Sequence, residues 1–171
     1  MQQHAPLPST GDSDATFREL DRLVAEVADM TRDDLPPHEF QQRLLDRAVQ
    51  ATGAAGGFVW AVRPNHTLHL EHQLFVSGGD RGTDEAGLRR HGSLAAAVLQ
   101  GGEPRRISPG SRNADSGQLE HPFEFALVFC PLGGDTMTAV VELLLGPGVP
   151  PATQDSCLRF LADLCELAGD F

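Results

Sequence analysis

Three histidines at a regular spacing, His66, His69 and His72, are residues whose type could bind a metal ion. Imidazole is a common zinc ligand, but zinc needs three or four ligands that converge at about 2 Å. The surrounding residues favour a β-strand, in which successive side chains point to opposite faces. His69 then points away from His66 and His72. We therefore interpret the three as ordinary strand residues and expect no metal site.

The three cysteines, Cys130, Cys157 and Cys165, could supply a nucleophile or a disulfide. Cys157 and Cys165 fall on one expected helix about 12 Å apart along its axis, which is too far to bridge. Cys130 lies in the most apolar run of the chain, where burial discourages nucleophilic use. We interpret all three as small buried hydrophobic residues. Their odd number and scattered positions favour a reducing compartment, the cytoplasm.

Charged residues in the second half of the chain could bind an anion. Arg90 precedes one expected helix and Arg105 follows it, and a guanidinium can hold an anion through two hydrogen bonds. Solvated surface charge is the alternative, and at most one of Arg105 and Arg106 can face inward on a strand. Glu142 lies among apolar residues, where an unpaired carboxylate would be costly. We expect it to face a rim or to accept a hydrogen bond from a ligand.

No catalytic motif accompanies these groups. The sequence has no Ser-His-Asp arrangement, phosphate-binding loop or dinucleotide fingerprint. An enzyme that used Cys130 or His121 would need a paired nucleophile and base, and no such pair is visible. We therefore expect the chain not to be an enzyme.

The length, the net charge and the apolar runs of the chain disfavour several classes of binding partner. A chain of 171 residues predicts one domain, here residues 14–171, after a flexible polar segment at 1–13. The formal net charge of −11 disfavours nucleic acid, because a phosphate backbone would be repelled. No apolar run approaches the roughly 20 residues that a membrane-spanning helix needs, so we expect no membrane partner.

The candidate residues must be positioned by helices that the apolar spacing predicts. Three main helices and one short helix are expected, over residues 15–31, 37–52, 153–171 and 93–100. In the last of the main helices, apolar side chains cover about half of the circumference, more than one core contact requires. This surplus favours a second contact, with the first helix or with another subunit; a single deeply buried helix is the alternative.

Two apolar runs within residues 125–145 surround Gly133-Gly134-Asp135 and predict a β-hairpin. Both parities of the first run are apolar, so this strand must be covered on both faces. Further strands are expected over residues 58–63, 68–76 and 104–107. Residues 77–91 and 108–122 are expected to be loops, and the length of the second is typical of a lid, a binding loop or a disordered segment.

Four segments in register resemble motifs of the GAF domain family. Residues 48–60, AVQATGAAGGFVW, resemble the family's second helix running through a Thr-Gly turn into its first strand. Residues 101–107 resemble the step into its middle strand. Residues 126–132 and 138–143 resemble its hairpin, with Ala139 where glycine is commoner.

The resemblance spans about residues 14–171 and implies an α+β fold of the GAF/PAS type. The central sheet would be six-stranded and antiparallel. The N-terminal and C-terminal helices would lie on one of its faces, and loops with a short helix would close a pocket over the other.

The resemblance also implies a non-catalytic regulatory or sensor domain in a larger signalling or regulated protein. It would bind an unidentified small molecule, or form a homodimer through helices 15–31 and 153–171, or do both. The alternative is a protein–protein interaction or dimerisation module whose pocket is filled and holds no ligand. Trp60, Phe75 and Phe125 meeting in the would-be cavity would favour this alternative.

The motifs with which family members bind cyclic nucleotides or bilins are absent from the sequence. The best-known ligands of the family are therefore disfavoured, and we expect no cofactor. The residues that would line or border the implied pocket are Trp60, Phe75, Arg90, Arg105, Phe125, Phe129 and Glu142. Aromatic residues at strand spacing are also typical of a plain core.

Overall fold

The computed structural model describes Arg22 and residues 25–29, 35–76, 82–112, 121–133 and 137–169. The expected flexible segment at 1–13 and most of the helix expected at 15–31 lie outside these residues. Arg22 and residues 25–29 are helical, within the range predicted for that helix.

Five strands form one antiparallel sheet in the order β2-β1-β5-β4-β3. The strands are β1 (Gly56–Val62), β2 (Leu68–Phe75), β3 (Arg105–Ile107), β4 (Leu127–Leu132) and β5 (Ala139–Leu144). The α+β class is confirmed. Within the described part of the chain the sheet has five strands where six were expected.

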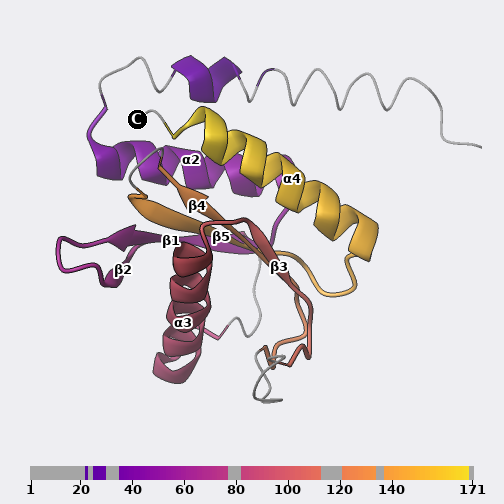
Figure 1. Ribbon diagram of the computed structural model, residues 1–171. Helices are drawn as coiled ribbons and strands as arrows, with labels where there is room; N and C mark the ends of the chain where they lie inside the picture. Colours follow the sequence, from indigo (N-terminus) through magenta and orange to yellow (C-terminus); the bar gives the residue numbers. More distant parts are fainter. Residues whose placement is uncertain are drawn as a thin grey trace, which may run out of the picture.

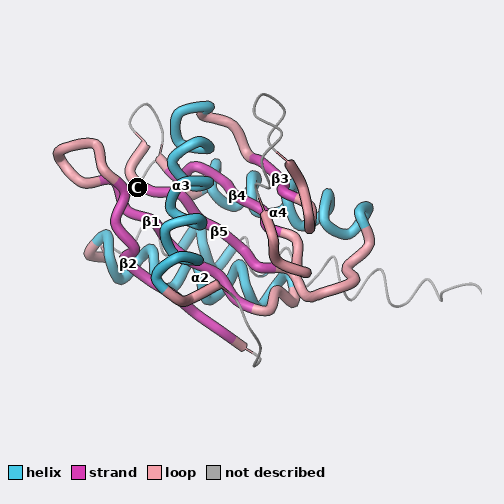
Figure 2. The backbone as a smooth tube through the Cα atoms, turned by 90° about the horizontal axis from the view of Figure 1, so that it is seen from below, coloured by secondary structure: helices cyan, strands magenta, loops and turns pink. Residues whose placement is uncertain are grey.

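The sheet has a helical layer on each face, as Figures 1 and 2 show. Helices α2 (Pro37–Thr52) and α4 (Pro151–Leu167) lie on one face, and α3 (Glu85–Gly101) stands on the other. Val27, in the first helical segment, is fully buried and belongs to the same core cluster as the buried residues of α2 and α4. That segment therefore packs on the side where it was expected.

The strands in the middle of the sheet are buried on both faces, as the sequence predicted for the hairpin. In β4, Val128 and Cys130 belong to the core under α2 and α4, whereas Leu127 and Phe129 belong to the core under α3. β4 pairs with β5 from Leu127 opposite Leu144 to Leu132 opposite Ala139. Alternate side chains of this hairpin thus pack into two separate cores, one on each face of the sheet.

Helix α2 begins and ends where the sequence predicts. Pro37 occupies its first turn, where a missing backbone N–H costs nothing. Gly53 follows with a left-handed φ of 62°, and its N–H donates to the carbonyl oxygen of Val49.

The predicted loop at 77–91 is wrong in its second half, because α3 already begins at Glu85. The Asp84 side chain caps this helix by accepting a hydrogen bond of 2.8 Å from the N–H of Gly87. Gly87 made the segment look like a loop, but its role is close packing. A Cβ there would lie 2.1 Å from the carbonyl oxygen of Gly82.

The long connection predicted at 108–122 is described at its two ends, and residues 113–120 lie outside the described part. The N–H of Gly110 donates to the carbonyl oxygen of His121 over 2.9 Å, and the N–H of His121 donates to Ser111 over 3.3 Å. The ends of the connection are therefore held together. No helix in the described part of the chain combines the length and apolar character needed to cross a membrane.

Replacing Gly57 by alanine is expected to destabilise the fold. A Cβ at this position in β1 would lie 2.5 Å from the backbone oxygen of Glu142 and 2.8 Å from Cδ1 of Leu45. Either β5 or α2 must then shift, and overpacking of this kind costs about 1–3 kcal/mol. Urea-induced unfolding measures the loss.

Gly101→Ala is the matched control. At this last residue of α3, an added Cβ meets no atom within 4 Å. The free energy of unfolding should stay unchanged or rise slightly, since alanine restricts the unfolded chain. Equal stability of the two variants would contradict the packing described for Gly57.

Candidate functional site

Aromatic side chains fill the space between α3 and the sheet. Phe58 lies at the centre, with its ring centroid 5.9 Å from Trp60, 5.6 Å from Phe75 and 5.0 Å from the imidazole of His91. Phe58 and Trp60 are two residues apart on β1, so both point to the face that α3 covers. Aromatic pairs at these separations stabilise by about 0.5–1.5 kcal/mol beyond the area they bury.

A second group of rings joins α3 to the segment that precedes β4. Phe123 is stacked between His91, at 5.5 Å, and Phe125, at 5.1 Å, with the rings nearly parallel. His121 lies edge-on to Phe123 and Phe125. Its Nε2–H donates to the carbonyl oxygen of Phe125, which holds this segment in a compact turn.

Glu142 supplies a carboxylate in the middle of this aromatic core. Both Glu142 and His91 have 0% exposure. The indole N–H of Trp60 donates to Oε2 over 2.8 Å, and Nδ1 of His91 is hydrogen-bonded to Oε1. Glu142 thus does not face a rim, and both its oxygens are satisfied by the protein itself. This removes much of the cost of burying a carboxylate.

The structure brings together five of the seven candidate residues. Those that lie on the α3 side of the sheet, in the aromatic core or hydrogen-bonded within it, are Trp60, Phe75, Phe125, Phe129 and Glu142. Arg90 and Arg105 are exposed. Arg106, the neighbour of Arg105, faces the other layer, where it pairs with Asp155 of α4 over 3.2 Å and donates to Gln154 over 3.2 Å.

His91 and Phe123 belong to this site and were not among the candidates. The signal for His91 was its helical spacing from Leu88, Leu94 and Ala95, which lie three residues before, three after and four after it. This signal was hidden because residues 77–91 looked like a loop. Phe123 had no comparable signal, since it lies outside the described strands and helices.

The histidines at 66, 69 and 72 do not converge. The expectation that all three are strand residues is wrong for His66, which lies in the turn before β2 with a φ of 59°. His69 and His72 lie in β2 and pair with different residues of β1. Among the residues that the structure describes, no group of three or more His, Cys, Asp or Glu is placed to hold a metal ion.

Two cysteines that lie far apart in the sequence meet in the core under α2 and α4. Cys130 of β4 and Cys165 of α4 both belong to this core, and the thiol of Cys130 donates to the carbonyl oxygen of Pro131 over 3.4 Å. Interaction with the Cys130 thiol, and then burial, hold the pKa of Cys165 well above its ordinary value of 9.0. Burial also raises the pKa of the Cys157 thiol. Thiols in this state are poor nucleophiles, because the thiolate is the reactive form.

Comparison with known proteins identifies the fold. No family model and no curated protein matches the chain. The A. aeolicus nlh2 GAF domain in an inactive state superposes with a TM-score of 0.63 at 15% identity, over 91% of this chain and 96% of that chain. The GAF domain from an Acinetobacter phosphoenolpyruvate-protein phosphotransferase gives 0.53 at 13% identity, over 95% of each chain.

The photosensory core module of a Stigmatella aurantiaca phytochrome gives a TM-score of 0.60 at 11% identity, over 97% of this chain and 38% of that chain. Together with the sheet order and the helices on both faces, these similarities define the class: the chain has the fold of a GAF domain.

The contact between His91 and Glu142 is expected to be strongly coupled. His91→Leu removes one of the two donors to a fully buried carboxylate, and breaking a buried pair in this way costs about 3–5 kcal/mol. Glu142→Leu leaves His91 and Trp60 without their acceptor. The double variant replaces the pair by apolar groups and should lose clearly less stability than the sum of the two single losses.

The exposed pair Arg63–Glu71, with 3.1 Å between Nη2 and Oε2, is the control for this double-mutant cycle. Its coupling energy should be about 0–1 kcal/mol, the usual value for a solvent-screened pair. Additive losses at His91 and Glu142 in urea-induced unfolding would show that the buried contact does not stabilise the fold.

Stability is expected to fall at alkaline pH because of the thiols. The chain contains no lysine and no tyrosine, so cysteine is the only type of side chain that ionises between about pH 8 and 11. The pKa of Cys165 is higher in the folded state than in the unfolded state. Above pH 9 the unfolded state therefore binds fewer protons than the folded state, and the free energy of unfolding decreases as pH rises.

Denaturant titrations of the wild type and of Cys165→Ala at a series of pH values test this sign. The wild type should hold its stability up to about pH 8 and then lose it. The variant should be less stable at neutral pH and should show a shallower alkaline decline. A wild-type profile that rises or stays flat above pH 9 would contradict the buried contact with Cys130.

Proposed function

We propose that this chain is a non-catalytic regulatory domain of a larger signalling protein, and that it acts by self-association through its helices. The fold supports a regulatory role, since proteins with similar structures include a methyl-accepting chemotaxis protein and a phytochrome photosensory module. The three cysteines form no disulfide, which fits a reducing compartment.

The packing of the aromatic core favours an association module over a ligand sensor. Trp60, Phe75 and Phe125 take part in the ring contacts between α3 and the sheet, together with Phe58 and His91. The space where the fold would hold a ligand is therefore occupied by side chains. This supports a module that signals through its surface.

Helix α4 offers the surface for self-association. Leu167 is 37% exposed, one of two large hydrophobic side chains that are exposed in the described part of the chain. Phe160 lies seven residues earlier, on the same flank of the helix, and is half-buried. The proposed dimer uses this flank together with the helix expected at 15–31, of which only Arg22 and residues 25–29 are described.

Ligand sensing remains the second candidate, favoured by the polar contacts of Glu142. A carboxylate with two donors is an unusual centre for an otherwise aromatic core. A small molecule that replaced His91 as the donor to Glu142 would move α3 away from the sheet. It would be lined by Trp60, Phe75, Phe125 and Phe129.

Native mass spectrometry of the purified protein separates these candidates, because it reports subunit count and bound mass together. Self-association predicts a dimer without added mass, whose population grows with protein concentration. A bound small molecule on a monomer would instead favour the sensor. A monomer without added mass, at protein concentrations up to about 1 mM, would contradict both.

Leu167→Glu is expected to weaken the dimer by about tenfold or more, because it places a charge in the apolar contact. Ala152→Glu, at the exposed start of α4, is the control and should leave the dimer unchanged. Sedimentation equilibrium measures both dissociation constants. Equal effects of the two variants would exclude the flank of Leu167 from the interface.

A further inference from the structure

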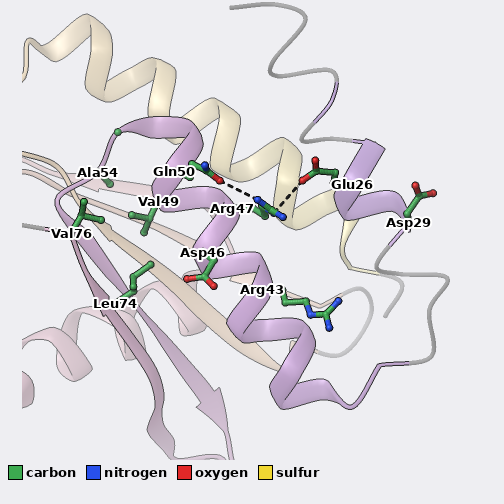
Figure 3. Close-up of a pocket in the computed structure, with 11 residues that line it drawn as sticks. Glu26, Asp29, Arg43, Asp46, Arg47, Val49, Gln50, Ala54, Leu74 and Val76 are labelled. Atoms are coloured by element: carbon green, nitrogen blue, oxygen red, sulfur yellow. Dashed lines mark hydrogen bonds and ion pairs between the residues drawn. The ribbon is translucent and has the colours of Figure 1, made fainter.

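A hollow of about 840 Å³ lies beside α2, on the opposite face of the sheet from α3. Figure 3 shows that its walls come from the helical segment 25–29, from α2, and from the end of β2 with the residues around Gly53. Hollows of about 300–1,000 Å³ are typical of small-molecule sites. The volume alone therefore suits a small ligand better than a flat protein partner.

One part of the hollow is apolar. Val49, Ala54, Leu74 and Val76 lie together there (Figure 3). Val49 and Ala54 are buried, Leu74 is half-buried, and Val76 is 68% exposed. Val76 is the other of the two large hydrophobic side chains exposed in the described residues. A ligand with an apolar chain would remove this surface from water, which is favourable.

The charged part of the hollow carries two arginines that are already engaged. Arg47 pairs with Glu26 of the first helical segment, with 3.1 Å between Nε and Oε2. Arg43 pairs with Glu39 one turn earlier on α2, with 2.6 Å between Nη2 and Oε1. Their positive charges are therefore largely compensated, and an anionic ligand would have to compete with these carboxylates.

Asp46 differs from the other charged residues of the hollow. Within the part of the chain that the structure describes, no hydrogen bond or ion pair involves its carboxylate. In Figure 3 it lies on the side of α2 that faces Leu74. The negative charge next to the apolar residues is thus available to a cation, and the net charge of −11 raises the local concentration of cations.

We propose that this hollow binds a small alkylammonium compound, a protonated amine with a short apolar chain. The ammonium group pairs with Asp46, and the alkyl chain covers Leu74 and Val76. The sequence contains no lysine, so a second copy of the chain carries no ammonium side chain and could present only guanidinium or imidazolium groups here. The site is separate from the aromatic core, and it shares the helical segment 25–29 with the surface proposed for self-association.

The test uses the full chain and three probes of equal chain length: n-hexylammonium, n-hexanol and hexanoate. Calorimetry gives the affinities, and methyl resonances of Leu74 and Val76 locate the binding. Hexylammonium should bind saturably and about two- to fivefold more tightly than hexanol, because only the ammonium pairs with the exposed Asp46 carboxylate, which water screens. Hexanoate should bind most weakly.

Two variants and a matched control assign the contacts. Asp46→Asn keeps the shape of the side chain and should weaken hexylammonium binding by about two- to fivefold, without changing hexanol binding. Val76→Thr should weaken both. Asp163→Asn, on the exposed side of α4, removes the same charge elsewhere and should have no effect.

Several outcomes would overturn the proposal. They are the absence of saturable hexylammonium binding, equal affinities for hexylammonium and hexanoate, and unchanged binding in Asp46→Asn. Hexylammonium affinity that falls as the protein dimerises would also overturn it, because the hollow would then belong to the surface between two copies. Loss of the dimer in Leu167→Glu leaves the expected amine binding intact, so the two proposals fail independently.

Discussion

The central strands of the sheet are apolar on both faces, and this requirement for cover on two sides organises the molecule. Helices α2 and α4 bury one set of side chains, and α3 with the segment before β4 buries the other. Glu142 is the exception among the apolar residues of β5. Its two oxygens need donors, and Trp60 and His91 supply them. The position of α3 is therefore set by a polar requirement as well as by packing.

Much of the fold could be predicted because local chemistry and packing agree. The hairpin at 125–145 could be predicted because two apolar runs flank a turn. Helix α2 could be predicted from the spacing of its apolar residues, from its proline and from Gly53. The first half of α3 could not be predicted, because Gly87 is a helical residue that packs closely against Gly82 and does not form a turn. That purpose is visible only when distant segments are assembled, so propensity favoured the wrong structure there.

The site was predictable where side-chain direction follows from strand parity. Trp60, Phe129 and Glu142 lie in strands and share the face that parity assigns to them. Strand alternation also predicted that at most one of the neighbouring Arg105 and Arg106 faces inward. It could not predict that Arg106 pairs with Asp155 of α4. The contact of Cys130 with Cys165 and the hollow beside α2 join segments remote in sequence. No local pattern encodes such contacts.

Trp60 is the single tryptophan of a chain that has no tyrosine. Its indole is anchored to Glu142, which in turn holds His91 on α3. Ultraviolet emission of the protein therefore comes from one fluorophore at the junction of α3 with the sheet. Any movement that separates these layers would change the polarity around the indole, and with it the emission wavelength. The molecule thus carries an intrinsic optical reporter of its own rearrangement, without a label.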